Sequence, residues 1–234
     1  MQLNKREISL DDIVAIDGPA GSGKSTVAKL LAGRLGYTYV DTGAMYRALT
    51  LKALREKLDL NNEDELTKLA QRTELDIVTD PSDNTIAMLD NNDVSSLIRT
   101  PELTSNISYI AKVKGVRERM RESQRRIASR GKCVFEGRDI GTVIFPNAKY
   151  KFYLDAEFAE RAKRRHKEML GKGYKTSYEE VAKDLKIRDH KDMNREIAPL
   201  KRAEDAVYID TTNMSITEVV DKLAVHIGGG KNSL

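Results

Sequence analysis

Short runs of apolar residues recur along the chain and are separated by longer stretches of mixed polarity. Runs of this length predict buried strands, and the stretches between them carry the apolar spacing of helices. The runs lie at residues 12–17, 37–41, 132–137, 151–155 and 207–210. Strands that alternate with helices predict an α/β fold in which crossover helices connect five parallel strands.

Capping residues predict where several helices begin and end. Gly36 has the residue type of a C-cap and predicts the end of a helix that follows the first strand. A second helix is expected at about residues 44–58. Ser215-Ile-Thr-Glu218 is a capping-box pattern, which predicts the start of the final helix.

Two segments depart from this alternation. Between residues 75 and 96 the runs LDIVT, TIAML and DVSSL are separated by the turn-rich PSDN and DNN, which predicts a small antiparallel insert. Gly171-Lys172-Gly173 interrupts two charged helical stretches and predicts the tip of a mobile arm. The tail, residues 228–234, is expected to fray.

The composition favours one domain without nucleic-acid or membrane partners. The 234 residues suffice for one α/β domain with a full core but not for two large ones. A net charge of +4 favours a solvated surface over a nucleic-acid-binding one. The polar N-terminus lacks the apolar stretch of a signal peptide, and no apolar run reaches membrane-spanning length. We therefore expect a cytoplasmic protein, and we expect it to be a monomer. Cys133 lies within the apolar run KCVFE and is expected to be a core residue.

Residues Gly18 to Ser25 read GPAGSGKS and fit the pattern G-x-x-x-x-G-K-[ST]. They follow the first strand and open a helix, so main-chain N–H groups and the positive end of the helix meet at one anion site. Lys24 can then bridge the outer phosphates, and the Ser25 hydroxyl can hold the Mg²⁺ that accompanies them. A glycine-rich turn without a ligand is the alternative, which this context disfavours. The segment predicts binding of ATP or GTP.

The segment DTGAMYR, residues 41–47, leaves the second strand at the edge where open α/β sheets bind ligands. If Thr42 caps the helix that follows, Tyr46 and Arg47 lie one turn onward and can approach the same anion. The guanidinium fork of arginine matches a phosphate. An ordinary helix start with a surface arginine is the alternative.

Five segments together resemble the bacterial-type cytidylate (CMP) kinase family. They are IDGPAGSGKST, DTGAMYR, the step IRT at 98–100, EGRDIGTVIFP at 136–146 and RD-x-x-D-x-N-R at 188–195, in the family's order over about residues 12–227. The resemblance implies a single P-loop kinase domain with an adenylate-kinase-like, three-layer fold. It implies a monophosphate-binding lobe with the antiparallel insert at about 43–98 and a mobile lid at about 161–187. It also implies transfer of phosphate from ATP to CMP or dCMP with Mg²⁺.

The resemblance also implies which groups hold the phosphates. The attacking oxygen is already an anionic phosphate oxygen, so the site needs clustered cations rather than a nucleophile with a base. The family match puts Arg47 and Arg138 on the acceptor phosphate and Lys24 on the donor. Glu136 would support the metal at Ser25, or would instead be the buried partner of an arginine. The expected ATP-binding residues are Gly18, Pro19, Ala20, Gly21, Ser22, Gly23, Lys24, Ser25 and Thr26.

Recognition of cytosine requires a protein acceptor for the N4 amine and donors for N3 and O2. The family match places the Asp139 carboxylate at the amine, with Ser108 and Arg117 at the other two atoms. A solvated helix face is the alternative for Ser108 and Arg117. The expected CMP-binding residues are Thr42, Tyr46, Arg47, Ser108, Arg117, Arg138, Asp139, Arg188, Asp192 and Arg195.

The last cluster has the spacing of one helix face, with Arg188, Asp192 and Arg195 at i, i+4 and i+7. The resemblance puts Arg188 and Asp192 on the sugar hydroxyls and Arg195 near the phosphates when the lid closes. Exposed ion pairs within the helix are the alternative. The expected catalytic residues are Lys24, Arg138, Arg161 and Arg195.

Three other functions fit parts of the pattern. A kinase for UMP or AMP is the nearest, and the DTG-x-x-YR and EGRD segments disfavour it. A GTPase switch would need an N-K-x-D segment to bind guanine, which the sequence lacks. A nucleic-acid-binding ATPase is disfavoured by the small net charge and by an aromatic content of 6%.

Overall fold

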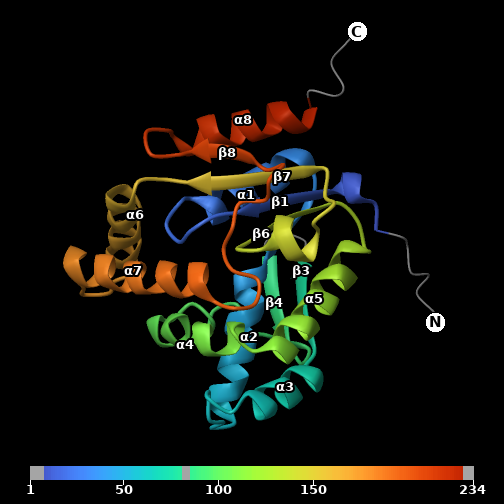
Figure 1. Ribbon diagram of the computed structural model, residues 1–234, viewed down its shortest axis with the longest axis vertical. Coiled ribbons are helices and arrows are strands. Elements are labelled where there is room, and N and C mark those ends of the chain that lie inside the picture. Colours follow the sequence, from blue (N-terminus) through green and yellow to red (C-terminus); the bar gives the residue numbers. More distant parts are fainter. Residues whose placement is uncertain (1–7, 81–84, 229–234) are drawn as a thin grey trace.

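A twisted sheet of five parallel strands lies at the centre of the computed structural model, which describes residues 8–80 and 85–228 (Figure 1). The strand order is β2-β6-β1-β7-β8. Each strand begins within one residue of its predicted start, so all five predicted strands are confirmed. Their bounds are β1 Ile13–Asp17, β2 Thr38–Asp41, β6 Cys133–Gly137, β7 Tyr150–Asp155 and β8 Val207–Asp210.

Helices connect and cover these strands. None of them within the described ranges is both long and apolar enough to cross a membrane. A 3₁₀ turn, η1 (Leu10–Asp12), precedes β1, and a π-helical turn, η2 (Ile140–Ile144), follows β6. The α-helices are α1 Lys24–Leu35, α2 Thr42–Arg55, α3 Glu63–Gln71, α4 Pro101–Ala111, α5 Lys114–Ala128, α6 Phe158–Gly171, α7 Tyr178–Asn194 and α8 Ile216–Gly228.

Strand β1 divides the core into two layers because its side chains alternate between the faces of the sheet. Ile13 and Ala15 belong to a cluster with buried residues of α2, α3, α4 and α5. Val14 and Ile16 pack instead with buried residues of α1 and α8. Figure 1 shows α8 above the sheet and α2 to α5 below it. The three-layer α/β prediction is therefore confirmed.

A second, antiparallel sheet packs into the larger of these clusters. It has the order β3-β4-β5, with bounds β3 Leu75–Thr79, β4 Thr85–Leu89 and β5 Asn92–Asp93. Leu75, Ile77, Ala87 and Leu89 bury their side chains against the same helices that cover the parallel sheet. The predicted antiparallel insert is confirmed, and it shares a core with the rest of the domain.

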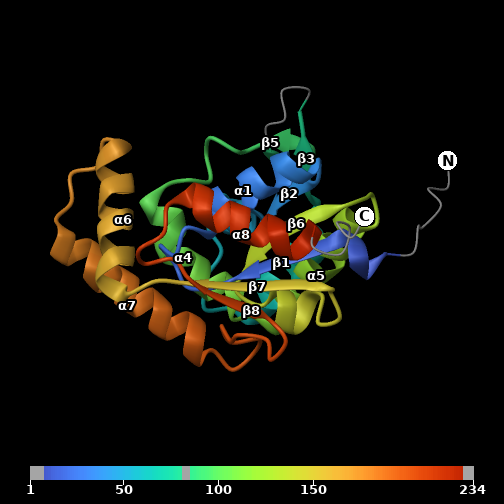
Figure 2. The same cartoon turned by 90° about the horizontal axis from the view of Figure 1, so that it is seen from above.

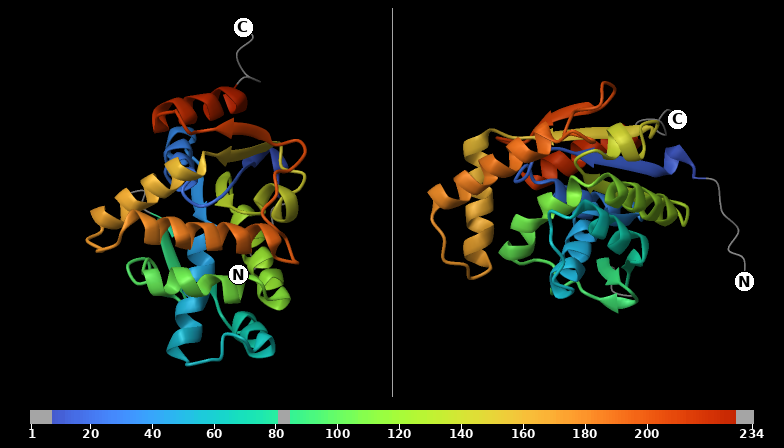
Figure 3. Two further views of the ribbon diagram at one scale, coloured as in Figure 1. Left: turned by 60° about the vertical axis from the view of Figure 1, so that its left-hand side comes forward. Right: turned by 60° about the horizontal axis from the view of Figure 1, so that its bottom comes forward.

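Helices α6 and α7 form a hairpin that projects away from the sheet (Figures 2 and 3). The turn between them contains Gly173, whose φ of 81° is in the left-handed region that favours glycine. Ser177 and Glu180 close a capping box at the start of α7. The predicted arm tip is confirmed as a turn, and its mobility stays a prediction.

Two expectations about local structure are wrong. The helix expected at about residues 44–58 is α2, which begins at Thr42 and ends at Arg55. It begins earlier than expected because Asp41, rather than Thr42, is its N-cap and accepts the N–H of Ala44 at 2.9 Å. Only the first residue of the run DVSSL is in a strand, because the Ser95 hydroxyl accepts the N–H of Ala87 and the chain turns.

Several other local predictions are confirmed. Gly36 caps α1 with a φ of 66°. Ser215 and Glu218 exchange the expected capping bonds. Cys133 is buried, and burial raises the pKa of its thiol to about 12. The predicted turn PSDN at 81–84, the first seven residues and the tail from 229 lie outside the described residues.

Candidate active site

The segment between β1 and α1 forms a tight loop in which glycines are required. A Cβ atom on Gly18 would lie 2.0 Å from the carbonyl oxygen of Leu154, and φ is 147° at this position. Gly21 and Gly23 also have positive φ, at 79° and 87°. These conformations turn the main chain around one concave site at the start of α1, as the sequence pattern predicts.

Lys24, the first residue of α1, folds back over this loop. Its Nζ donates to the carbonyl oxygen of Pro19 at 2.5 Å and to the hydroxyl of Ser22 at 3.3 Å. Burial, and next the positive charge of Arg138, lower the pKa of Lys24 well below its ordinary value. A buried cation crowded by another cation is in the environment that an anionic ligand would stabilise.

Ser25 faces Glu136, which lies near the end of the neighbouring strand β6. The Ser25 hydroxyl donates to Oε2 of Glu136 at 2.8 Å, and the Tyr39 hydroxyl donates to Oε1 at 2.5 Å. Burial is the main reason that the pKa of Glu136 is raised, and the nearby carboxylate of Asp41 adds to it. The hydrogen bonds of Glu136 therefore come from hydroxyl groups rather than from an arginine.

These oxygen atoms fit a hard cation beside the loop. A hydroxyl and a carboxylate are ligands that Mg²⁺ accepts, usually together with water and phosphate oxygens. Within the two described ranges no three His, Cys, Asp or Glu side chains gather as a metal-binding group. Ser25, at the start of α1, and Glu136, near the end of β6, are thus groups that could hold a metal arriving with its nucleotide.

Two arginines near the same edge of the sheet pair with carboxylates. Arg47 on α2 donates to Asp41 at 2.7 Å, and both side chains are largely buried. Arg138, directly after β6, donates from Nε to Asp192 of α7 at 2.8 Å. Burial alone would raise the pKa of Asp192, but the Arg138 and Arg188 guanidinium groups outweigh it and hold that pKa below its ordinary value.

Asp139 joins two more of the predicted residues. One carboxylate oxygen is paired with the guanidinium of Arg117, and the other lies 3.5 Å from Arg195. Arg117 also lies over the ring of Tyr46, 5.9 Å from its centroid. Both Asp139 and Arg117 are buried. Arg117 therefore does not lie on a solvated helix face.

The cluster at the end of α7 is not arranged as one helix face. The helix ends at Asn194, and Arg195 follows in an extended conformation, so that expectation is wrong. Asp192 pairs with Arg138 rather than with an arginine of its own helix. Burial, and next Arg138, lower the pKa of Arg188 to about 10. The Nε atom of Arg188 is buried without a hydrogen-bond partner in the described part of the chain.

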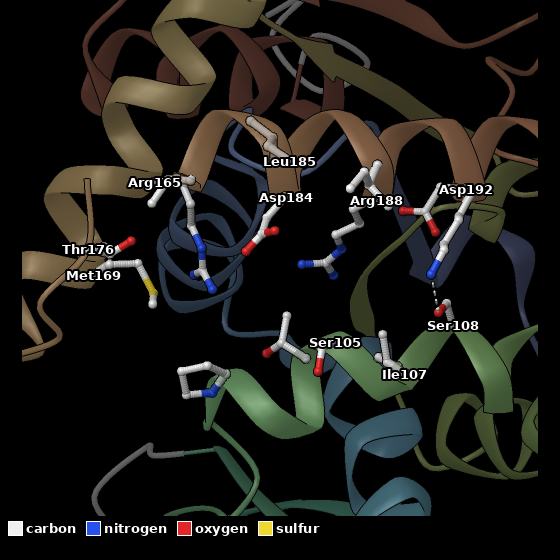
Figure 4. Close-up of a pocket in the computed structure, with 15 residues that line it drawn as sticks. Ser105, Ile107, Ser108, Arg165, Met169, Thr176, Asp184, Leu185, Arg188 and Asp192 are labelled. Carbon is white, nitrogen blue, oxygen red and sulfur yellow. Dashed lines mark hydrogen bonds between the residues drawn. The ribbon is translucent and has the colours of Figure 1, made fainter. Parts of the chain in front are cut away.

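A cavity of about 220 Å³ lies between α4 and the α6–α7 hairpin (Figure 4). Three of the predicted CMP-binding residues line it, namely Ser108, Arg188 and Asp192. Lys191 bridges its two walls, since its Nζ lies 3.4 Å from the Ser108 hydroxyl. Arg165 and Arg188 both extend into the cavity from the hairpin side. The cavity thus joins the hairpin to the helices below the sheet.

Two predicted residues have their polar groups engaged elsewhere. The Thr42 hydroxyl donates to the carbonyl oxygen of Glu136 at 2.7 Å. Arg161 is buried and donates to the carbonyl oxygens of Ala20 and Ala156 and to the carboxylate of Asp189. Arg161 therefore ties α6 to the loop before α1 and does not line the cavity.

The sequence interpretation did not select three residues that the structure places at this site. Asp17 ends β1, Tyr39 lies in β2, and Arg165 follows Arg161 by one helical turn. Asp17 and Tyr39 could be predicted from the sequence, because each is a polar side chain in an apolar strand that ends at the ligand-binding edge of the sheet. Arg165 is a lid candidate together with Arg161 and Arg164, and the sequence does not distinguish it from them because its neighbours are also cations.

Known proteins resemble this chain over nearly its whole length. Residues 14–228 match the family described as Cytidylate kinase. A cytidylate kinase of Carboxydothermus hydrogenoformans is 47% identical over 94% of this chain and 99% of its own. One of Desulforamulus reducens is 49% identical over 93% of this chain and 97% of its own. Among solved structures, a shikimate kinase from Acinetobacter baumannii in complex with shikimate has a TM-score of 0.43 at 17% identity, covering 94% of this chain and 95% of its own.

Proposed function

The chain belongs to the cytidylate kinase family, whose members are ATP-dependent phosphotransferases, and we propose that it transfers the γ-phosphate of ATP to CMP or dCMP. The observation that carries this proposal is the crowding of cations at one edge of the sheet. Burial is the largest cause of the lowered pKa of Lys24 and of Arg188, Arg138 is the next cause for both, and Arg47 also lowers that of Arg188. Two phosphate-bearing ligands that meet there would neutralise this charge.

In this reaction Lys24 holds the outer phosphates of ATP, and Arg47 and Arg138 hold the phosphate of CMP. A phosphate oxygen of CMP attacks the γ-phosphorus while the bond to the β-phosphate oxygen breaks. No protein base is needed, because the attacking oxygen already carries negative charge. The chain contributes position and positive charge, which are the main requirements of phosphoryl transfer.

Mg²⁺ bound with ATP would neutralise part of the charge on its phosphates. Ser25 would ligate it directly, and Glu136 would hold a water molecule of its shell. The hydrogen bond of 2.8 Å between these two side chains supports this assignment. The Tyr39 hydroxyl would orient the carboxylate from its other side.

For the cytosine base, Asp139 would accept from the N4 amine while Arg117 and Ser108 serve N3 and O2. The pairing of Asp139 with Arg117 supports this, because the two groups already lie side by side in a buried site. Arg188 and Asp192 would bind the sugar hydroxyls, and Arg195 would reach the phosphates. Tyr46 and Thr42 would complete the wall of the site.

We further propose that the region at about 43–98 is the monophosphate-binding lobe and that the hairpin at about 161–187 closes as a lid. Closure would exclude water from the transferred phosphate. Arg161, at the base of the hairpin, would screen the charge of the transferred phosphate. Arg165, which lines the cavity, is a second candidate for this role. Solution scattering would detect compaction with ATP and CMP together, and an unchanged radius of gyration would contradict closure.

The direct test is an assay of ADP release with CMP, dCMP, UMP and AMP as acceptors. The expected order is CMP or dCMP first, with UMP and AMP far behind. Preferred use of UMP or AMP would replace the proposed substrate. Hydrolysis of ATP without transfer to any acceptor would contradict the kinase assignment itself.

Three further parts of the proposal concern the protein in the cell. We propose a monomer, located in the cytoplasm, that binds nucleotides but not nucleic acids. The small net charge of +4 supports the last point. Light scattering of the protein with both nucleotides tests the monomer, and retention on single-stranded DNA at low salt would contradict the absence of nucleic-acid binding.

A further inference from the structure

A buried carboxylate connects the two sides of the site. Asp17, the last residue of β1, is 4% exposed. In the sheet it lies beside Gly137, directly before Arg138 and Asp139. Its Oδ1 accepts the main-chain N–H of Ile140 at 2.9 Å, and its Oδ2 accepts that of Gly141 at 2.7 Å. Both carboxylate oxygens of Asp17 therefore accept hydrogen bonds from the turn that follows Arg138 and Asp139.

These two N–H groups are the first of η2. The N-cap of η2 is Asp139, a residue type that usually caps with its own carboxylate. Asp139 makes no such bond here, and its main-chain carbonyl oxygen accepts from Val143 at 2.9 Å. Its carboxylate is paired with Arg117 and lies near Arg195 instead. Asp17 thus caps the N–H of Gly141, the second residue of η2, which the carboxylate of Asp139 would otherwise cap, and it also holds the N–H of Ile140.

The packing around Asp17 leaves little room for another arrangement. A Cβ atom on Gly141 would lie 3.1 Å from Cδ of Lys151 and 3.5 Å from Oδ2 of Asp17. A Cβ atom on Gly137 would lie 2.7 Å from Cδ1 of Ile140. Both glycines allow the turn to approach the end of β1 closely enough for the two bonds.

We propose that Asp17 is a positioning residue that caps η2 from β1 and so keeps the carboxylate of Asp139 free to bind the cytosine amine. This inference rests on the proposed function, because it concerns the base preference of the same site. Without Asp17, the N–H groups of Ile140 and Gly141 would lack acceptors. Asp139 would then turn its carboxylate back to cap the N–H of Gly141, as N-cap aspartates do.

The two main-chain donors beside Asp17 require a side chain with two acceptor oxygens. Burial raises its pKa to about 7, although both main-chain N–H groups act in the opposite direction. An asparagine of the same shape would accept from only one of the two, because its NH₂ group would face the other N–H. A charged side chain is costly in this buried position. Only a carboxylate, with two acceptor oxygens, accepts from both N–H groups.

The test compares Asp17→Asn with wild type and with Asp12→Asn at pH 8. Asp12 precedes the same strand and pairs with Lys132 at 3.5 Å, so it is a matched control outside the site. We expect Asp17→Asn to raise KM for CMP about tenfold and to lower the CMP-to-UMP preference about tenfold. KM for ATP should stay within about twofold. Equal changes in both KM values with an unchanged base preference would overturn the proposal, since a merely structural role predicts them.

The double variant Asp17→Asn/Asp139→Asn tests whether Asp17 acts through Asp139. Its base preference should equal that of Asp139→Asn alone, because the positioned group is already gone. Two losses that simply multiply would show independent roles and would overturn the proposal.

Amide hydrogen exchange tests the cap without relying on activity. In Asp17→Asn the N–H groups of Ile140 and Gly141 should exchange about tenfold faster relative to wild type. If that variant does not fold, Asp139→Asn serves instead and should leave both amides protected. Loss of their protection in Asp139→Asn would show that Asp139 is the cap and would overturn the proposal. If wild-type protein fails to phosphorylate CMP, the proposed function fails, whereas this measurement still decides the cap.

Discussion

The proposed donor and acceptor sides of the site are built in different ways. The donor side is one continuous segment, residues 18–25, in which glycine conformations direct the main chain around the ligand. The acceptor side assembles side chains from α2, α5, α7 and the end of β6, and these side chains already pair with one another. Arg47 is paired with Asp41, and Arg138 with Asp192. A phosphate that binds there must therefore compete with carboxylates.

This difference suggests how each side discriminates between ligands. A cradle of main-chain groups binds any phosphate chain of the right length and carries little information about the base. A network of paired side chains rejects a ligand that leaves its buried groups without partners. Affinity for the nucleotide tail should therefore depend on the donor segment, and base selectivity on the acceptor network.

The largest expected effect is on the donor side. Lys24→Ala removes the cation that would hold the outer phosphates, and kcat should fall about 10³-fold. The fold should persist, because the substitution removes a buried charge rather than an apolar contact. Discontinuous assays of ADP formation measure kcat, and circular dichroism measures whether the fold persists.

Lys29→Ala is the control for this variant, since Lys29 lies on the same helix but is exposed. Its kcat should equal that of wild type. A Lys24→Ala enzyme with near-normal turnover would show that the donor phosphates are held elsewhere.

The next effect is on the acceptor side. Asp139→Ala removes the proposed acceptor for the cytosine amine, and the CMP-to-UMP ratio of kcat/KM should fall about 10²-fold. KM for ATP should remain near the wild-type value if the two sides are as separate as their construction indicates. Asp64→Ala, an exposed site on α3, is the control. A changed KM for ATP with an unchanged base ratio would contradict the division of roles.

The two sides also differ in how far the sequence predicts them. The P-loop is recognisable because its chemistry is contiguous and its glycines are needed for local reasons. The identities of Arg117, Arg138 and Asp139 could be expected from family resemblance, but their partners could not. The pairing of Arg138 with Asp192 spans 54 positions, and nothing local in either segment specifies it. The sheet order, which brings them together, becomes visible only in the folded chain.

Local ambiguity accounts for the predictions that are wrong. Asp41 and Thr42 are adjacent residues that can both cap a helix, and the choice depends on Glu136, whose carbonyl oxygen takes the Thr42 hydroxyl. Arg195 fits a helical spacing that the chain leaves one residue earlier. For Thr42 a tertiary contact decides the cap, and for Arg195 the helix end decides the geometry, and neither is visible in the local spacing.

A smaller effect concerns the dependence of stability on pH. The pKa of Asp17 is raised to about 7 in the folded protein, against an ordinary value near 3.8. Between those values the folded state holds a proton that the unfolded state has lost, so stability decreases as pH rises towards 7 and then levels off. From pH 5.5 to pH 7.5 wild type should lose about 2 kcal/mol relative to Asp17→Asn.

Urea unfolding of both proteins at the two pH values measures this difference. Other titrating groups, among them Glu136, are present in both proteins and cancel in the comparison. A difference between the variants that does not change with pH would mean that Asp17 titrates near its ordinary value in the folded protein.

The smallest expected effect tests whether the donor side also depends on paired side chains. Tyr39→Phe removes the hydroxyl that bonds Glu136 at 2.5 Å, and one such bond contributes about 1 kcal/mol. We expect kcat to fall about threefold and the Mg²⁺ concentration at half-maximal rate to rise by a similar factor. Tyr37→Phe, one residue before β2 and in contact with Lys132, is the control. A fall in kcat with an unchanged Mg²⁺ dependence would indicate that Glu136 positions the loop and does not support the metal. The donor side would then depend on its main-chain groups even more than proposed.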